Sequence, residues 1–595
     1  MKPEIRSLLE RTYDRETERL AVEEGLIRLD RPGHTKEIAH LAHCREGRQT
    51  AHVYAFGTLL GRLGEAEGGE MLRALAKLQR TDRADPHYGG FRWYAEESNV
   101  NDTNAAFFIV RPLVLLRLWH PEAIPASHAR IMDDMLAHAG EWFRRECLLP
   151  TLYYPNKIVS DGAMLLAVSA ILGREEYVEA GIRFFERWED YTERRGWGWG
   201  ENMSVAYIAV IVISLQIAAT VLDGRMHSLG ARLRGRIEEL YGMLRFHDGE
   251  EPVPAIRSYN FSGETVRPDP LWVAAGVRGI RELDPGRLTL NGLLLFLPFG
   301  DELAAGSRTS QETRQPVPRE RTERIFDDSR AYSWIGRHTR LGSLNRFPVI
   351  PGSYQWPTWG LGWQSFPASF SVAGEQLSFV RWYVDLGDEV RTHPGESYRT
   401  SYLAPALFRE SFFPDVQTRS AQAGNVLLTV RSMSGVHNRA AAIADEWVVH
   451  RYAGRPIAMT TRSDGREWQV LPYPRATVAL TALRGIPCGR EERVPMRIAV
   501  EPEKGRLKLR QVLLERNGAA ETVVHPRLEA GWAVVVLDGE ASLDAVAAYL
   551  ETVRIRDVDE PDGEVPRAAY AYVRDIRLSD SGGERVRLQA DPYGV

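Results

Sequence analysis

The sequence predicts an α+β multidomain protein in which an N-terminal α/α toroid is followed by a C-terminal antiparallel β-sandwich. Two observations lead to this prediction. Up to about residue 300, helical segments of two types alternate, and after about residue 325 short strand-type runs replace them. The chain has 595 residues, and one hydrophobic core stops growing at roughly 250–300 residues, so at least two domains are expected.

The helical half contains amphipathic segments and segments that are apolar on every side. Residues 128–147 and 174–195 have one apolar stripe and one charged face, whereas residues 105–119 and 205–222 are apolar almost throughout. A helix that is apolar all round is buried all round, so the alternation predicts inner helices wrapped by outer ones. Inner helices are expected to begin near Gly47, Asn104, Ser160, Asn202 and Asp269. An α-solenoid is the competing architecture, but no fixed-length repeat with matching residues is present.

The second half contains short runs rich in β-branched and aromatic residues, separated by Gly, Pro, Asn and Asp. Residues 377–386 and 532–539 are examples, and strands at this density without intervening helices indicate an antiparallel sandwich. A polar, Pro-containing stretch precedes them and is typical of a linker. The predicted boundaries are 1–304 for the toroid, 305–325 for the linker and 326–595 for the sandwich.

Composition argues against several classes of protein. A net charge of −5 does not favour nucleic-acid binding, and the three cysteines form no CxxC pair. His40 and His43 share a helical face but have no carboxylate at ligand spacing, so no metal or other cofactor is expected. The start of the chain lacks an apolar signal segment, and Ser214 and Gln216 interrupt the apolar run 205–222. We therefore expect a cytoplasmic protein without membrane spans.

Four polar, aromatic-rich loops lead into the apolar helices. They cover residues 87–104, 151–161, 194–204 and 247–269. Helices that begin at one rim of a helical ring present their first residues to one shared cleft. Aromatic rings together with carboxylates, amides and basic groups suit the binding of a sugar chain, so the loops predict a saccharide site.

The order of toroid and sandwich resembles the layout of several polysaccharide lyase families, including heparinase, chondroitin and hyaluronate lyases and oligoalginate lyases. The resemblance covers nearly the whole chain and is one of layout, with no family motif matched. It implies β-elimination, in which an amide, His or Arg neutralises a uronate carboxylate while Tyr or His moves the proton. The same order also resembles that of some glycoside hydrolases.

The loops contain residues of every type that elimination requires. For catalysis the candidates are His87, Asn101, Tyr154 and Tyr259, and for binding the substrate Tyr88, Asn104, Asn156, Lys157, Asn202 and Arg257. Asn and Asp before a helix are also favoured N-caps, so capping alone is the competing explanation for several of them.

Hydrolysis requires two carboxyl groups that flank the scissile bond. Asp102, Asp161 and Glu201 are each expected at the start of an inner helix, which makes them candidates for this pair. Toroid-type unsaturated glucuronyl hydrolases are similar in using carboxylates from successive inner helices, although the residues around these positions do not match their motif. The alternative explanation is that the acidic groups complement the helix dipole.

Several aromatic residues are predicted to form platforms for pyranose rings. Trp93, Trp197 and Trp199 lie in the toroid loops, the last two in a Gly-rich segment, and Trp356 and Trp359 lie in a similar segment of the second half. His437, in a predicted strand connection, could contribute to the same cleft.

The sequence therefore predicts an enzyme that cleaves uronic-acid-containing oligo- or polysaccharides by β-elimination. A glucuronidase-like glycoside hydrolase is the alternative, and a non-catalytic carbohydrate-binding or scaffold protein is the second alternative. The expected partner is a saccharide substrate, with neither nucleic acid nor membrane, and a homo-oligomer is left open.

Overall fold

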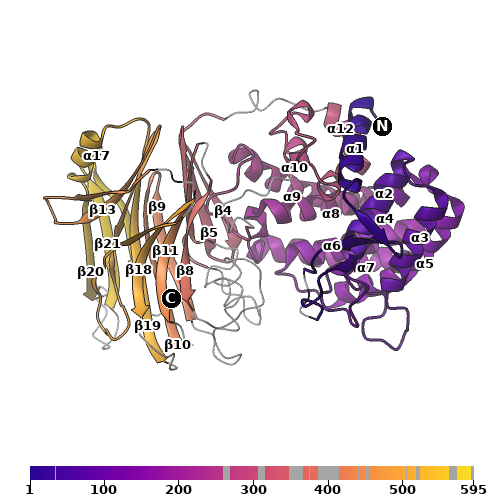
Figure 1. Ribbon diagram of the computed structural model, residues 1–595, viewed down its shortest axis with the longest axis horizontal. Helices are drawn as coiled ribbons and strands as arrows, with labels where there is room; N and C mark the ends of the chain where they lie inside the picture. The colour runs from indigo at the N-terminus through magenta and orange to yellow at the C-terminus, as the bar shows by residue number, and fades with distance from the viewer. Residues whose placement is uncertain are drawn as a thin grey trace. The chain divides into compact units, whose positions relative to one another are not determined.

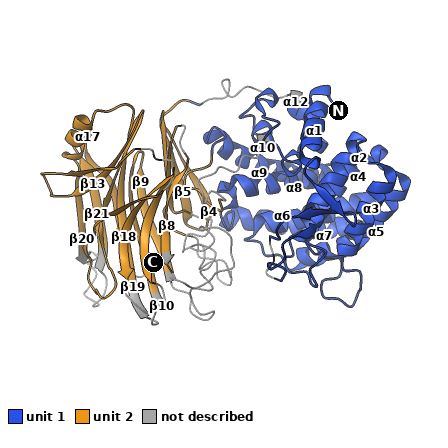
Figure 2. Cartoon of the chain, viewed as in Figure 1, with its two compact units in different colours: residues 1–250, 267–315 blue, residues 251–266, 316–595 orange. Residues whose placement is uncertain are grey.

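The computed structural model divides into two compact units. Unit 1 contains residues 1–250 and 267–315, and unit 2 contains residues 251–266 and 316–595 (Figure 2). The structure describes residues 1–33, 35, 37–258, 269–305, 315–347, 366–373, 376–385, 415–438, 441–450, 452, 454–503, 505–516, 523–561 and 572–590.

Two layers of helices form the main part of unit 1 (Figure 1). The inner helices are α2 (Gly47–Leu60), α4 (Ala105–Trp119), α6 (Pro155–Leu172) and α8 (Val205–Asp223), and the outer helices are α3 (Glu65–Leu78), α5 (Ala126–Leu148), α7 (Glu175–Arg195) and α9 (His227–Phe246). Each inner helix packs on the next inner helix along the chain, and each outer helix packs on the next outer one. This alternation confirms the predicted α/α toroid.

Shorter elements complete unit 1. They are α1 (Pro3–Thr17), β1 (Ala21–Glu23), β2 (Leu26–Leu29), β3 (Cys44–Glu46), η1 (Pro121–Ala123), η2 (Glu201–Met203), α10 (Asp269–Ala274), η3 (Ile280–Glu282), α11 (Leu290–Leu293) and α12 (Phe296–Ala305). The three strands form one antiparallel sheet. Helices α1 and α11 pack on α2, and α12 packs on α4. The helix expected near Asp269 is therefore present but is only six residues long.

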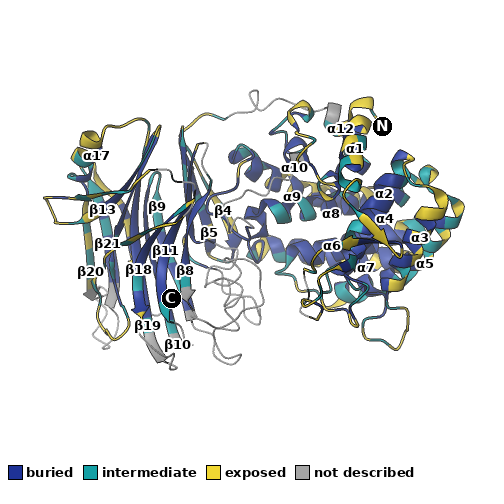
Figure 3. Ribbon diagram, in the orientation of Figure 1, coloured by how far each residue is buried: buried dark blue, intermediate teal, exposed yellow. Residues whose placement is uncertain are grey.

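Hydrophobicity explains the layering. Residues of α4 and α6 are buried on nearly every side, whereas α3 and α5 keep exposed residues on one face (Figure 3). By length and composition α6 and α8 could each cross a membrane, but 83% and 61% of their most apolar windows are buried within the protein. Helix α6 begins at Pro155, five residues before the predicted start, so Asp161 lies in its second turn.

Two large antiparallel sheets form unit 2, which confirms the predicted sandwich. The eight-stranded sheet contains β4 (Arg319–Phe326), β5 (Ser329–Ile335), β6 (Thr339–Leu344), β7 (Ala368–Val372), β8 (Ser378–Asp385), β11 (Ala442–His450), β17 (Ala499–Glu503) and β18 (Arg506–Glu515). The six-stranded sheet contains β9 (Asp415–Ala423), β10 (Val426–Asn438), β12 (Ile457–Thr460), β13 (Glu467–Tyr473), β14 (Ala476–Ala482) and β19 (Val523–Asp538). Trp447 and Trp532 belong to the buried cluster that the two sheets share.

A third layer covers the other face of the six-stranded sheet. It contains β20 (Arg554–Pro561), β21 (Tyr572–Asp580), β22 (Gly583–Ala590) and α17 (Leu543–Leu550), and a buried cluster joins Val546 and Ile576 to Trp468 of β13. The strands β15 (Arg484–Gly485) and β16 (Val494–Pro495) form a small separate pair.

Two predicted boundaries need correction. Strand β4 begins at Arg319, inside the stretch 305–325 that was expected to be linker. Residues 251–266, expected in the toroid, belong to unit 2. The reason is backbone pairing: Ala255 accepts from Phe366 N (2.9 Å) and donates to Ser369 Oγ (3.2 Å). Residues 251–258 of the fourth predicted loop are therefore held by the sandwich strands.

Candidate functional site

Three of the predicted loops meet at the starts of inner helices. Asn104 is the N-cap residue of α4, Tyr154 directly precedes α6, and Trp199 lies in the loop before α8. The Asn104 Nδ2 atom donates a hydrogen bond to the Tyr154 hydroxyl (3.2 Å), and the Tyr154 ring packs on Trp199 with 4.3 Å between centroids and 39° between the ring planes. Asn104 and Tyr154 are both half-buried and therefore reach solvent. The convergence expected from the sequence is thus found for these three loops.

The conformation of the Gly-rich loop places Trp199. Gly198 has a φ of +64°, and a Cβ atom there would lie 2.2 Å from the Tyr153 carbonyl oxygen, so glycine is required at this position. The Trp199 backbone N–H donates to that same carbonyl oxygen (3.2 Å). As a result, Trp199 packs against the rings of both Tyr153 and Tyr154.

A buried amide–carboxylate pair lies at the first turn of α6. The backbone N–H of Asn156 donates to one oxygen of Glu201 (2.7 Å), and its Nδ2 atom donates to the other (2.5 Å). Both residues are buried. The Glu201 carboxylate thus satisfies one of the N–H groups that a helix start leaves without an intrahelical partner.

Lys157 connects two carboxylates beside this pair. Its Nζ atom donates to Asp161 Oδ2 (2.6 Å) and to Glu146 Oε2 at the end of α5. Burial opposes the charge of Lys157, but the two carboxylates outweigh it and raise the lysine pKa above its ordinary value. Burial raises the pKa of Asp161 to about 7, and Lys157 only partly offsets this effect. Asp161 therefore holds a proton near neutral pH, and its Oδ1 atom has no hydrogen-bond partner among the described residues.

His87 and Tyr88 contact the outer helix α5. The Tyr88 hydroxyl pairs with His138 Nδ1 (2.7 Å), and the His87 ring stacks on Trp142 with 6.3 Å between centroids. These contacts anchor the start of the loop to α5.

Asn101 and Asp102 shape the end of the same loop. Asn101 Nδ2 donates to Glu37 (2.6 Å) and to Glu97 (3.0 Å), and hydrogen bonds from Ser98 and then Asn101 lower the pKa of Glu37 to about 2. Asp102 Oδ1 accepts from the Asn104 backbone N–H (2.9 Å). This is the local turn and capping role that was the alternative explanation for the acidic residue.

The prediction that the loop tryptophans are sugar platforms is wrong for Trp93, Trp197 and Trp199. Their side chains are only 1%, 6% and 2% exposed, so they present no free face to a pyranose ring. Trp93 packs on Phe108, and Trp197 packs on Trp188 of the outer helix α7. The glycines with positive φ turn the loop back onto the helices, which the sequence pattern alone did not reveal. Asn202 lies in η2 and is buried as well.

The remaining candidates belong to unit 2 or lie outside the described residues. Arg257 is buried, with a φ of +50°, in the segment that belongs to unit 2. His437 has backbone pairing to Val524 within β10, but its side chain lies outside the described part. Tyr259, Trp356 and Trp359 also lie outside it, so their roles stay predictions.

Sequence reasoning missed Glu146 at the end of α5. The only signal is the short connection between α5 and α6, which makes the two helices antiparallel neighbours and brings the end of one to the start of the other. Among the described residues, no group of three or more His, Cys, Asp or Glu side chains could hold a metal ion.

The fold class is an α/α toroid followed by an antiparallel β-sandwich. No family model matches this chain, and no curated protein matches it in sequence. Among solved structures it is similar to a heparinase III, with 10% identity over 91% of this chain and 82% of that one and a TM-score of 0.48. A Streptomyces coelicolor A3 chondroitin AC lyase in complex with chondroitin sulphate has 10% identity over 100% and 95% of the two chains and a TM-score of 0.49. Both neighbours are polysaccharide lyases, the class whose layout the sequence resembles.

Proposed function

We propose that the protein cleaves uronic-acid-containing oligo- or polysaccharides by β-elimination and that Tyr154 transfers the proton. The observation that supports this best is the hydrogen bond from Asn104 to the half-buried Tyr154 hydroxyl at the starts of two neighbouring inner helices. Two candidate carboxylates are engaged elsewhere, since Glu201 accepts from Asn156 and Asp161 pairs with Lys157.

In this reaction the base takes the proton from the carbon next to the uronate carboxylate. A carbon–carbon double bond forms, the bond to the 4-linked oxygen breaks, and that oxygen takes up a proton. The Asn104 N–H group is aimed at the phenol oxygen, so it would orient Tyr154 and stabilise negative charge on that oxygen during the proton transfer. Once protonated, Tyr154 can return the proton to the leaving oxygen.

Asn104 also has unused hydrogen-bonding capacity. Its side-chain amide carries two N–H groups, one of which is directed at Tyr154, and its Oδ1 atom is buried without a partner among the described residues. The second N–H group is available for the uronate carboxylate, whose charge must be compensated before the neighbouring carbon becomes acidic. One residue would thus bind the carboxylate and orient the base.

A glycoside hydrolase is the second candidate, and the raised pKa of Asp161 favours it. A carboxyl group with a pKa of about 7 retains the proton that a general acid must donate. Against this role, Asp161 is fully buried and bonded to Lys157, whereas the acid of a hydrolase must reach the glycosidic oxygen.

The test is an incubation with a panel of uronate oligosaccharides, followed by the ultraviolet absorbance of the unsaturated product. We expect Tyr154→Phe to reduce kcat by about 10²–10⁴-fold, the range for loss of a general acid–base group. Tyr153→Phe is the matched control, because this neighbouring tyrosine contacts the same Trp199 and should retain activity. Full activity of Tyr154→Phe would contradict the assignment.

The panel also separates the two enzyme classes. Reducing ends that appear without the unsaturated chromophore, and that disappear in Asp161→Asn, would establish the hydrolase. If neither product forms with any saccharide of the panel, the result would favour the interpretation as a non-catalytic binding protein.

A further inference from the structure

A group of cationic side chains lies between the inner helices α2 and α4, apart from the Tyr154 site. Arg48 and His52 are one helical turn apart on α2, and Arg111 comes from α4. His52 and Arg111 are each only 2% exposed. Among the described residues, Arg111 Nε and Nη1 and His52 Nε2 have no hydrogen-bond partner.

Aromatic rings, not carboxylates, surround the Arg111 guanidinium. Its central carbon lies 5.2 Å from the centroid of the Phe108 ring and 5.9 Å from that of Phe107. Arg48 is partly exposed, pairs with Glu46 (3.0 Å) and lies over Trp93. The Glu46 carboxylate therefore compensates the charge of Arg48, and no described carboxylate pairs with Arg111.

The charges of Arg48 and Arg111 repel each other and also disfavour a charge on His52. Burial, followed by the charge of Arg48, lowers the pKa of Arg111 to about 9. Burial, followed by Arg48 and Arg111, lowers the pKa of His52 to about 3. This arrangement disfavours positive charge, keeps His52 neutral near pH 7, and would be stabilised by a negative charge placed beside Arg111.

Two buried arginines of unit 2 have counter-charges. Arg574 pairs with Glu529 (2.7 Å) and Asp557 (2.6 Å), and Arg431 pairs with Asp445. Buried charges are paired as a rule, because removing an ion from water without compensation is unfavourable. A contact with an aromatic face supplies only part of this compensation. Arg111 differs from Arg574 and Arg431 in having no carboxylate partner among the described residues, and this difference points to a ligand.

We propose that Arg111, with Arg48 and His52, binds an oxyanion: a carboxylate or sulfate group. Guanidinium groups match the geometry of such anions and can donate two parallel hydrogen bonds. Arg48 stands at the start of α2 with a side chain that is 31% exposed, which provides the route from solvent. His52, one turn further along α2, lines the inner end.

We infer further that the oxyanion is part of the saccharide substrate, and this step rests on the proposed function. Arg111 follows Asn104 by seven residues on α4, which corresponds to about 10 Å along a helix. An acidic saccharide at Tyr154 could thus be recognised through a second charged group, and the substrate class would be a polyanionic chain. The anion site itself does not depend on catalysis.

The experiment is isothermal titration calorimetry of the full chain with inorganic sulfate and with sodium glucuronate, at constant ionic strength. We expect saturable binding of at least one probe, and at least about tenfold weaker binding in Arg111→Met, because a charge-assisted hydrogen bond is lost. The probe that binds more tightly identifies the group as sulfate or carboxylate.

Arg117→Met is the matched control, since it removes the same charge from the same helix. Arg117 pairs with Asp133 (3.3 Å), and its loss should leave the affinity unchanged. Arg48→Met, at a partly exposed position, should weaken binding severalfold even if Arg111→Met does not fold. Equal affinity in wild type, Arg111→Met and Arg48→Met, or no binding of either probe, would overturn the proposal. A missing unsaturated product with intact Arg111-dependent binding would instead reject the lyase and leave the anion site standing.

Discussion

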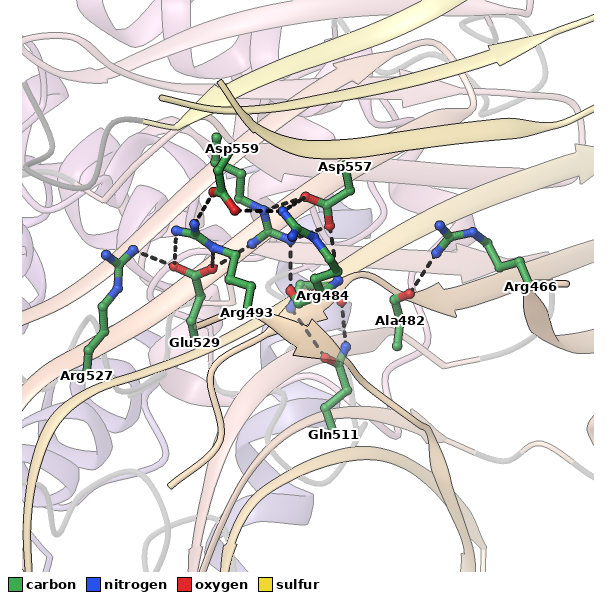
Figure 4. Close-up of polar contacts among 11 residues, drawn as sticks. Arg466, Ala482, Arg484, Arg493, Gln511, Arg527, Glu529, Asp557 and Asp559 are labelled. Carbon is green, nitrogen blue, oxygen red and sulfur yellow. Dashed lines mark hydrogen bonds and ion pairs between the residues drawn. The ribbon is translucent and has the colours of Figure 1, made fainter. Parts of the chain in front are cut away.

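Buried charges are compensated differently in the two units. In unit 2, Glu529 accepts hydrogen bonds from Arg493, Arg527 and Arg574, and part of this network with Asp557 and Asp559 is drawn in Figure 4. In unit 1, Asp161 shares a single lysine with Glu146, and Arg111 has no counter-charge among the described residues.

For four buried carboxylates, the direction of the pKa shift follows the number of cations beside them. Burial raises the pKa of Glu529, but three arginines outweigh it and the pKa is lowered. Glu446 has two arginine partners, and its pKa is lowered as well. With one cation each, Asp445 and Asp161 have raised pKa values of about 6 and about 7, because burial prevails.

Sheets and helices differ in how easily they supply these partners. Neighbouring strands place side chains of one face about 5 Å apart, so several arginines can surround one carboxylate. An inner helix packed among apolar helices has few such positions. The charges around Glu529 in unit 2 are therefore suited to stability, whereas Arg111 in unit 1 is the group for which we propose anion binding.

The largest expected effect follows from breaking the compensated network of unit 2. Glu529→Gln leaves three arginines without their shared carboxylate and should lower the free energy of unfolding by about 3–5 kcal/mol. Urea denaturation measures this loss. Glu584→Gln is the control, because this half-exposed residue lies 3.8 Å from Arg577 and should change stability by no more than about 0.5 kcal/mol. Similar losses in both variants would contradict the comparison.

A smaller effect concerns the pH dependence that Asp161 confers on unit 1. Its folded-state pKa of about 7 lies above the ordinary value of 3.8, so between these pH values the folded chain holds a proton that the unfolded chain has released. Stability from this group is present below about pH 4 and is lost as the pH rises through 7, by at most about 1.4 kcal/mol per pH unit.

Denaturation between pH 5 and 8 should show a steeper loss of stability with rising pH in the wild type than in Asp161→Asn, over a range of about three pH units. Asp190→Asn, which removes an exposed carboxylate of α7 paired with Arg194, should keep the slope. Parallel curves for wild type and Asp161→Asn would mean that the carboxylate is ionised throughout.

The smallest expected change is in Arg111→Met without added anion. Removing an unpaired buried cation should be neutral or should stabilise the protein by about 1 kcal/mol, since methionine fills most of the same apolar space. Arg574→Met removes a paired cation and should instead be strongly destabilising. Thermal unfolding in sulfate-free buffer compares the two, and a large loss in Arg111→Met would indicate a compensating partner.

Hydrophobic periodicity by itself determined the two-domain architecture, because the pattern of apolar residues directly encodes which faces are buried. It also located the starts of α4, α6 and α8 to within five residues, and with them Asn104, Tyr154 and Glu201. It could not reveal that Glu146 joins Lys157, since that contact connects two helix ends through packing.

Only the tertiary structure decided which loop residues turn inward and which partners the charges find. Trp197 and Trp199 are buried because glycines with positive φ fold their loop back onto the helices, and residues 251–258 are held by strands more than 60 residues further along the chain. Arg111 has the same sequence signature as any other arginine in a helix. Whether Arg111 has a counter-charge depends on which side chains packing places around it, and a local sequence pattern does not contain that information.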